Sequence, residues 1–198
     1  VWSLVYDAGE EVRELVRQAH ALYFAENGLN PTAFPSLRKF ENDIVRMVAG
    51  LLGGDEGVCG AMTSGGTESI MMAVKTARDA MRSQRPDIRA PELVLPITAH
   101  PAFDKAAHFL GVKTVHIPVD EHYRVDVAQM AAAINPNTIL LVGSAPAYPH
   151  GVMDDISALS DLAARHNLFL HVDACIGGFM LPFLQKLGYP VPPFGFTL

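Results

Sequence analysis

Asp173 stands where a carboxylate could take part in chemistry, at the carboxyl end of the apolar run 169–172. Such a run is typical of a buried strand, and in open α/β sheets ligands bind just beyond the carboxyl ends of the strands. The small residues Ala174, Gly177 and Gly178 follow, which leaves room for a flat ligand close to the backbone. The alternative is that Asp173 only caps a turn.

The segment 63–69, with the sequence TSGGTES, predicts a phosphate-binding site. It stands between a predicted strand and a long predicted helix, so the free backbone N–H groups of the helix start would face a ligand. Gly65 and Gly66 allow a tight turn, and the hydroxyls of Ser64 and Thr67 add hydrogen-bond donors. The segment matches neither the Walker pattern nor the dinucleotide-binding fingerprint. An ordinary N-capped helix is the alternative.

Two histidines stand near the predicted carboxyl edge of the sheet. His100 follows a predicted strand and precedes Pro101, so its flat ring could stack on a planar ligand, although a lone histidine is as often structural. His171 stands two residues before Asp173 and therefore on the same face of its strand. We favour a core role for His171 over support of the carboxylate.

A loop rich in proline and glycine, residues 144–151, follows another predicted strand and would reach the same edge. Ser144 and His150 in this loop could contact the ligand, but capping and turn roles are equally consistent with the sequence. Asp154 and Asp155 then open the next predicted helix.

The candidate site residues would be positioned by a regular alternation of strands and helices after Gly57. The predicted strands are 58–62, 93–98, 113–117, 138–142 and 168–172. The predicted helices between them are 66–82, 102–110, 127–134 and 156–166. Alternation of this kind predicts an α/β fold with a mostly parallel sheet and helices on both faces.

Before this alternation, residues 1–53 are predicted to form an N-terminal arm with two amphipathic helices, and residues 54–198 a partial ligand-binding domain. Apolar residues recur at helical spacing between Ala8 and Asn27 and again after Ser36, which could cap the second helix. Gly53 and the glycine after it would end that helix.

The composition is typical of a well-buried globular protein. Of the 198 residues 49% are hydrophobic and 18% are charged, and the net charge of −6 is spread along the chain without a basic patch. We therefore expect neither nucleic acid nor an anionic membrane surface as a partner. No apolar run reaches the roughly 18 residues of a membrane span. Cys59 and Cys175 stand in apolar surroundings without metal-ligand spacing, so we expect no metal site and buried, reduced thiols in a cytoplasmic protein.

A phosphate-binding helix start, a ring-stacking histidine and a carboxylate are thus predicted at one edge of the sheet. A planar, phosphorylated ligand with a basic ring nitrogen would satisfy all three. Pyridoxal 5′-phosphate is such a ligand, and a carboxylate beside its ring nitrogen keeps that nitrogen protonated, so that the ring can act as an electron sink.

Five segments carry a resemblance to a known family, namely NPTAFPSLRKFE, TSGGTES, TAHPAF, APAYPHGVMDDI and HVDACIGGF. Together they resemble the sphingosine-1-phosphate lyase branch of the group II pyridoxal-phosphate decarboxylases over nearly the whole chain. The resemblance implies an aspartate-aminotransferase-type (fold type I) large domain and a homodimer with active sites at the subunit interface. It also implies that Gly65, Gly66 and Thr67 hold the cofactor phosphate, that His100 stacks on the ring, and that Asp173 pairs with the ring nitrogen.

The reaction implied by the resemblance is a retro-aldol cleavage of a phosphorylated long-chain base between its second and third carbons. It gives a fatty aldehyde and phosphoethanolamine. The family's Schiff-base lysine lies in a Ser/Thr-His-Lys-type motif well beyond the aspartate, and none of the lysines here stands in such a motif. The chain also opens without an initiator methionine, so we expect a piece of a longer protein, incomplete at its C-terminus, whose lysine follows Leu198.

The substrate-binding pattern departs from the family at one position. The lyases share an Asn-Pro-Leu-His stretch whose histidine helps to bind the substrate phosphate, and the matching residues here begin at Asn27 and end at Asn30. An amide donates a hydrogen bond but carries no charge, which weakens an anion contact. The resemblance also places Tyr6 near the substrate, a small or lipid-like phosphorylated amine.

We therefore predict a carbon–carbon lyase that depends on pyridoxal phosphate, and two alternatives stay open. An amino-acid decarboxylase breaks another bond at the same carbon with the same electron sink, so the cofactor residues do not separate the two reactions. A non-catalytic phosphate- or nucleotide-binding domain would keep the phosphate site, but it gives Asp173 and His100 no common role.

Overall fold

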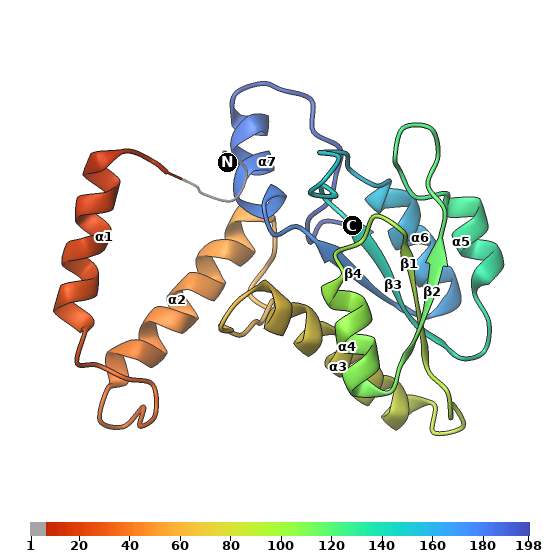
Figure 1. The fold of residues 1–198 in the computed structure, drawn as a ribbon, viewed down its shortest axis with the longest axis horizontal. Coiled ribbons are helices and arrows are strands. Elements are labelled where there is room, and N and C mark those ends of the chain that lie inside the picture. Colours follow the sequence, from red (N-terminus) through yellow and green to blue (C-terminus); the bar gives the residue numbers. More distant parts are fainter. Residues whose placement is uncertain (1–6) are drawn as a thin grey trace. The chain divides into compact units, whose positions relative to one another are not determined.

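The computed structural model describes residues 7–198, and the chain divides into two compact units, Val1–Ile44 and Val45–Leu198. The elements in chain order are α1 (Glu10–Tyr23), α2 (Pro35–Leu51), α3 (Gly66–Gln84), β1 (Glu92–Pro96), α4 (Ala102–Leu110), β2 (Lys113–Ile117), α5 (Val127–Ala133), β3 (Thr138–Ser144), α6 (Ile156–His166), β4 (Phe169–Asp173) and α7 (Gly177–Lys186), as Figure 1 shows. The predicted domain boundary at residue 53 stays a prediction.

The first unit contains α1 and the first part of α2. The apolar face predicted for α1 includes Leu15 and Leu22, and both side chains are exposed. Glu10 in the first turn favours the helix start, because the helix dipole stabilises negative charge there. The helix ends at Tyr23, whose ring contacts Phe40 of α2 edge-on at a centroid distance of 5.8 Å.

Helix α2 begins at Pro35, so Ser36 lies inside the first turn and the prediction that it caps this helix is wrong. Proline is favoured at the first helical position because its φ angle suits the helix and its missing N–H would have no partner there. The helix ends at Leu51, and Gly53 follows with a φ of 75°, a left-handed conformation that glycine adopts at low cost.

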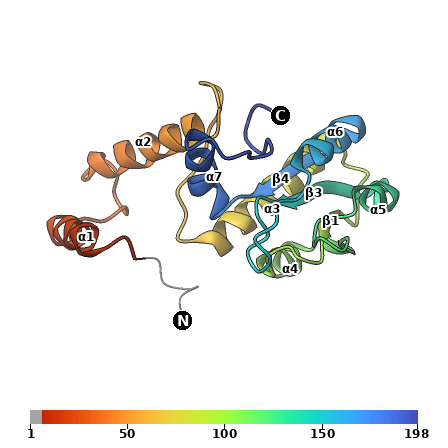
Figure 2. The ribbon, with the colours of Figure 1, turned by 90° about the horizontal axis from the view of Figure 1, so that it is seen from above.

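The second unit is built on a parallel sheet of four strands in the order β2-β1-β3-β4. Strands β1 and β3 are central and buried along their whole length, as near-continuous apolar runs covered on both faces should be. Helices α3 and α4 pack on one face, and α5 and α6 pack on the other (Figures 1 and 2). The predicted α/β fold with a parallel sheet between helical layers is therefore confirmed.

Two buried clusters hold these layers together. One cluster contains Val74 of α3 and Phe103 of α4, and the other contains Met130 of α5 and Leu159 of α6. Because successive strand residues point to opposite faces, each central strand contributes to both clusters. All four of these helical side chains are fully buried.

The predicted strand at residues 58–62 is wrong, since this segment forms no strand and is largely exposed. An extended segment becomes a strand only when its backbone groups pair with a neighbour. Within residues 7–198 no strand pairs with it. Cys59 lies in this segment, and both Cys59 and Cys175 are exposed free thiols, which corrects the expectation that they are buried.

Helix α7 is absent from the sequence prediction, which interpreted its first residues only as room for a ligand. The helix starts at Gly177, where a methyl group would lie 1.8 Å from the carbonyl oxygen of Ala145. Only glycine therefore lets α7 start this close to the end of β3. No helix in the described part of the chain combines the length and the apolar character needed to cross a membrane.

A buried carboxylate ties the amino end of the sheet together. Glu92, at the start of β1, accepts hydrogen bonds from Asn135 Nδ2 at 2.7 Å and from Lys113 Nζ at 2.8 Å. These bonds, that from Asn135 first, hold the pKa of the Glu92 carboxyl below its ordinary value of 4.5. They join the start of β1 to the start of β2 and to the turn before β3.

Candidate functional site

Asp173 is the last residue of β4 and lies in register with Ser144, the last residue of β3. The backbone N–H of Ala145 donates to the carbonyl oxygen of Asp173 at 2.8 Å. The Asp173 side chain is partly buried and accepts a hydrogen bond from the backbone N–H of Cys175 at 3.3 Å. Among the described residues, no lysine or arginine forms an ion pair with it. This carboxylate can therefore receive a cationic group from a ligand.

His171 is two residues before Asp173 on β4, and its ring packs against the core residue Phe103. Its ring meets the ring of Phe103 edge-on, with the centroids 5.5 Å apart. Burial lowers the pKa of the His171 imidazole, while the charge of Asp173 acts in the opposite direction. The ring is therefore neutral near pH 7, in agreement with the core role favoured from the sequence.

His100 is held at the start of α4 with its ring exposed. Its Nδ1 accepts a hydrogen bond from the backbone N–H of Ala102 at 3.1 Å. Because Nδ1 is the acceptor, the proton of the neutral ring is on Nε2. The bond fixes the ring beside the first turn of α4, where Pro101 occupies the N-cap position and provides no side-chain cap.

The start of α3 presents backbone donors to solvent. Its N-cap residue is Gly65, which has no side chain with which to cap the helix. No side chain in residues 7–198 accepts a hydrogen bond from the N–H of Gly66 or of Thr67. These amides and the positive end of the helix dipole suit an anion. The alternative of an ordinary side-chain-capped helix is therefore not supported.

The hydroxyl of Ser64 has a partner inside this loop. Both its backbone N–H and its Oγ donate to the Glu68 carboxylate, each at 2.6 Å. The bond from the Ser64 hydroxyl, followed by that from its backbone, lowers the pKa of Glu68. The structure therefore places Ser64 in the predicted loop with its hydroxyl already bound to Glu68, and its role toward a phosphate stays a prediction.

Shared packing brings these segments to one face of the sheet. Ile70 of α3, Phe103 of α4 and Val142 of β3 belong to the same buried cluster. Ile70 is about one helical turn beyond Thr67, and Phe103 is three residues beyond His100. The predicted phosphate-binding loop, the exposed imidazole and β3, which pairs with the strand that ends at Asp173, are thus anchored to a common core.

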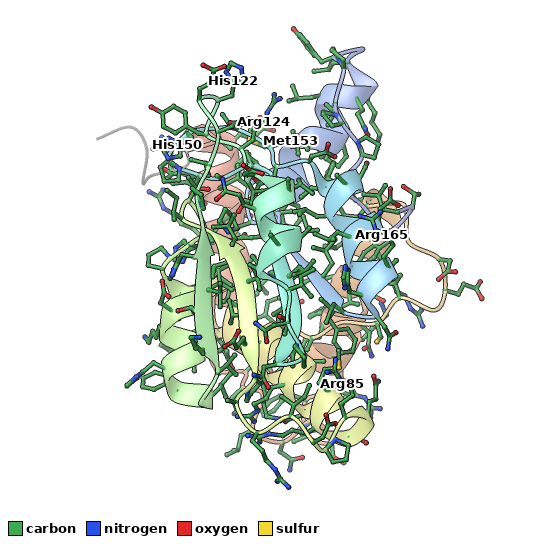
Figure 3. The ribbon with its side chains drawn as sticks, turned by 90° about the vertical axis from the view of Figure 1, so that its right-hand side faces the viewer. Arg85, His122, Arg124, His150, Met153 and Arg165 are labelled. Atoms are coloured by element: carbon green, nitrogen blue, oxygen red, sulfur yellow. The ribbon has the colours of Figure 1, made fainter. Side chains whose placement is uncertain are left out.

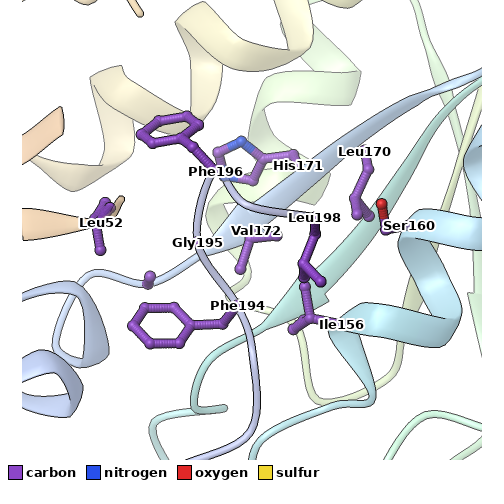
Figure 4. A pocket seen from close by; sticks show the side chains of 11 residues that line it. Leu52, Ile156, Ser160, Leu170, His171, Val172, Phe194, Gly195, Phe196 and Leu198 are labelled. Atoms are coloured by element: carbon purple, nitrogen blue, oxygen red, sulfur yellow. The ribbon is translucent and has the colours of Figure 1, made fainter. Parts of the chain in front are cut away.

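A cavity of about 450 Å³ borders β4 (Figure 4). It is mainly apolar and is lined by Leu170, His171 and Val172 of β4, by Ile156 of α6 and by the segment that includes Phe194. Neither the α3 start nor His100 lines it. Val172 and Ala174, which stand on either side of Asp173, do line it, so the cavity borders the end of β4 where Asp173 lies.

His150 contacts an aromatic ring of the protein, and its contact with a ligand stays a prediction. Its ring stacks on Tyr123 with the centroids 4.3 Å apart and the planes 8° from parallel. Both residues line a second cavity of about 510 Å³, together with Pro101 and with the hydrogen-bonded pair His116 and Asp104. Figure 3 shows His150 at the end of the sheet opposite Arg85.

Three residues are predicted to contact the substrate, and the structure describes two of them. Tyr6 is outside the described residues. Asn27 and Asn30 are exposed in the first unit, and their side-chain oxygens accept bonds from backbone N–H groups two residues later, at Leu29 and Thr32. These bonds stabilise local turns. Their contact with a substrate stays a prediction.

Sequence reasoning missed Asp154, which it interpreted only as part of a helix start. The carboxylate is 2% exposed and receives two backbone hydrogen bonds at the carboxyl edge of the sheet. The sequence did contain a signal. One aspartate is enough to cap a helix, and two adjacent aspartates precede this one. Asp155 is that cap, since it accepts from the N–H of Ala158 at 3.0 Å.

The predicted site residues fit a planar ligand with an anionic tail and a cationic ring. Uncapped amides at Gly66 and Thr67 suit the anion, the exposed ring of His100 suits a flat face, and Asp173 lacks a cationic partner within residues 7–198. The same features fit pyridoxal phosphate, whose phosphate and protonated ring nitrogen carry those charges.

Comparison with known proteins agrees with this fit. The profile of the pyridoxal-dependent decarboxylase conserved domain matches residues 3–192. Sphingosine-1-phosphate lyase of Dictyostelium discoideum is 47% identical over 100% of the chain, which covers 37% of that protein. The probable L-aspartate decarboxylase of Pyrococcus abyssi is 43% identical over 93% of the chain and 47% of its own length.

A solved structure matches the fold. Sphingosine-1-phosphate lyase of Burkholderia pseudomallei K96243 superposes with a TM-score of 0.93 and 39% identity, over 99% of this chain and 47% of that one. The fold type I architecture implied by the resemblance is therefore confirmed. The chain spans less than half the length of each of these three relatives.

Proposed function

Because the chain belongs to the family of pyridoxal-dependent decarboxylases, we propose that the complete protein is a carbon–carbon lyase that depends on pyridoxal phosphate. Its proposed substrate is a phosphorylated long-chain amino alcohol similar to sphingosine 1-phosphate, and its products are a fatty aldehyde and phosphoethanolamine. The observation that carries this proposal is the partly buried Asp173 carboxylate without a cationic partner in the described part of the chain. The lyase relatives named above support the choice of reaction.

Each site residue has a defined task in this proposal. The N–H groups of Gly66 and Thr67 bind the cofactor phosphate, and the ring of His100 covers one face of the cofactor ring. Asp173 holds a proton on the ring nitrogen through a charged hydrogen bond. Pyridoxal phosphate, when bound, supplies an electron sink for the negative charge left on the carbon next to the substrate amine.

The cofactor-binding lysine is proposed to lie in a part of the complete protein outside this chain. All five lysines of the chain make contacts elsewhere. The ion pairs are Lys39 with Asp43, Lys75 with Asp79, and Lys113 with Glu92, and the cation–π contacts are Lys105 with Phe109 and Lys186 with Phe183. None of these contacts involves Asp173 or His100.

An amino-acid decarboxylase is the second candidate, and one residue favours it. Asn30 stands where the lyases are expected to have a histidine for the substrate phosphate, and an uncharged amide binds an anion more weakly. The 43% identity to a probable L-aspartate decarboxylase supports the same alternative. A non-catalytic nucleotide-binding domain receives no support from these relatives.

We also propose that the complete protein is a cytoplasmic homodimer.

The test uses the complete protein supplied with pyridoxal phosphate. A phosphorylated sphingoid base and, separately, aspartate are offered as substrates, and aldehyde release is measured against carbon dioxide release. Aldehyde together with phosphoethanolamine supports the lyase, whereas carbon dioxide from aspartate supports the decarboxylase. Borohydride reduction and peptide mapping then identify the lysine that carries the cofactor. A protein that binds no pyridoxal phosphate contradicts both candidates.

A further inference from the structure

Asp154 is a buried residue in the turn between β3 and α6, and both of its carboxylate oxygens accept hydrogen bonds from the backbone. Its Oδ1 accepts from the N–H of Val125 at 2.8 Å, and its Oδ2 accepts from the N–H of Ser144 at 2.8 Å. Its own N–H donates to the Ser144 carbonyl at 3.0 Å, which closes the loop 144–154. One side chain therefore joins the segment before α5 to the end of β3.

Burying this carboxylate would destabilise the folded protein if either hydrogen bond were lost. Burial raises the pKa of Asp154, and the two backbone hydrogen bonds, first that from Val125, act against the shift. No ion pair compensates its charge within residues 7–198. A buried charge is tolerated only where hydrogen bonds satisfy it, so the two donors must be held close to their present positions.

The segment that Asp154 holds also contacts the end of β4 and the start of α7. Ser144 is in register with Asp173, and the N–H of Ala145 donates to the Asp173 carbonyl at 2.8 Å. The carbonyl of Ala145 lies against Gly177, where no methyl group would fit. A displacement of residues 144–145 would therefore move the end of β4 and the start of α7 together.

We propose that Asp154 is a positioning residue, which sets the place of the Asp173 carboxylate by holding Ser144 and Ala145. This inference rests on the proposed function, because the carboxylate needs a fixed place only if it pairs with a cofactor ring. Groups that face a reacting centre lose much of their effect when they are misplaced by about 1 Å. Asp154 itself contacts neither the α3 start nor His100 in the described hydrogen bonds.

The test replaces Asp154 by asparagine in the complete protein. The amide keeps the shape but turns one acceptor into a donor, so one backbone N–H loses its partner. We expect the dissociation constant of pyridoxal phosphate to rise by about tenfold or more, as for other residues that orient a binding group, and the absorption band of the bound cofactor to shift. Both are measured by titration at a temperature where the variant is folded.

Glu92→Gln is the matched control. Glu92 is also a buried carboxylate with two hydrogen-bond partners, but it lies at the amino end of the same sheet. We expect this variant to lose stability while its cofactor affinity stays within about twofold of the wild type, since residues far apart act independently. Equal affinity losses in both variants, or none in either, would assign Asp154 a purely structural role and overturn the inference.

A second variant covers the case in which Asp154→Asn does not fold. Ala145→Gly loosens the intermediate segment and leaves the carboxylate in place, and we expect it to weaken cofactor binding in the same direction. Unchanged affinity and an unchanged absorption band in Ala145→Gly contradict the inference. A wild-type protein that binds no pyridoxal phosphate overturns the proposed function instead, so the two failures are distinguishable.

Discussion

Phe103 and His171 meet edge to face with their ring centroids 5.5 Å apart, and this contact joins the start of α4 to the strand that ends at Asp173. Phe103 is fully buried, whereas Phe109 on the same helix is 62% exposed. The two phenylalanines therefore allow a comparison between a residue under the site and one outside it.

Phe103→Ala should destabilise the protein by about 3–5 kcal/mol, because it leaves a cavity in the core beneath the site. Phe109→Ala, the control, should change the free energy of unfolding by about 0.5 kcal/mol or less. Urea denaturation followed by circular dichroism measures both. Similar losses in the two variants would contradict the packing described here.

Gly66→Pro should retain the fold and lose affinity for the cofactor phosphate. Gly66 is the first residue of α3, a position that favours proline, and a Cβ there meets no atom within 4 Å. The substitution removes one N–H, and a hydrogen bond to a charged group is worth about 1.5–3 kcal/mol. The dissociation constant of pyridoxal phosphate should therefore rise by roughly tenfold to a hundredfold. Gly66→Ala keeps the N–H, so an equal loss in that variant would point to steric exclusion instead.

Asp173→Asn should impair catalysis with little change in stability. The amide oxygen can still accept from the N–H of Cys175, but the negative charge that holds a proton on the cofactor ring is lost. Loss of one partner from a hydrogen-bonded charge pair costs about 2–5 kcal/mol, so kcat/KM should fall on the order of a hundredfold. Asp155→Asn is the control, because asparagine also caps helices well. Unimpaired activity in Asp173→Asn would remove this residue from the site.

Stability should depend on pH through Glu92. The folded protein lowers the pKa of this carboxyl from its ordinary value of 4.5, so its stabilising contribution is present above that pH. It is lost as the pH falls through the lower, folded-state pKa. Unfolding experiments across this range should show a smaller acid-induced loss of stability in Glu92→Gln than in the wild type. Parallel curves would show that Glu92 makes no such contribution.

Local patterns predicted most of the elements that position the site. Helical spacing and strand runs predicted α4, α6 and β2 at their observed bounds. The segment 58–62 has the same apolar character but forms no strand, because strand formation requires a pairing partner that the pattern of one segment does not contain. The exposure of Cys59 follows from the same lack of a covering neighbour.

The amino-acid sequence predicted the fold class, the order along the chain of the glycine-rich loop, His100 and Asp173, and the resemblance to a cofactor-binding family. These properties follow from residue types at short spacing, which a sequence displays directly. Three contacts appear only in the folded structure, where Ser64 binds Glu68, His150 stacks on Tyr123, and the buried Asp154 binds the N–H of Ser144. Burial and hydrogen bonding depend on which distant segments the sheet and its helices bring together, and that information is spread over the whole chain.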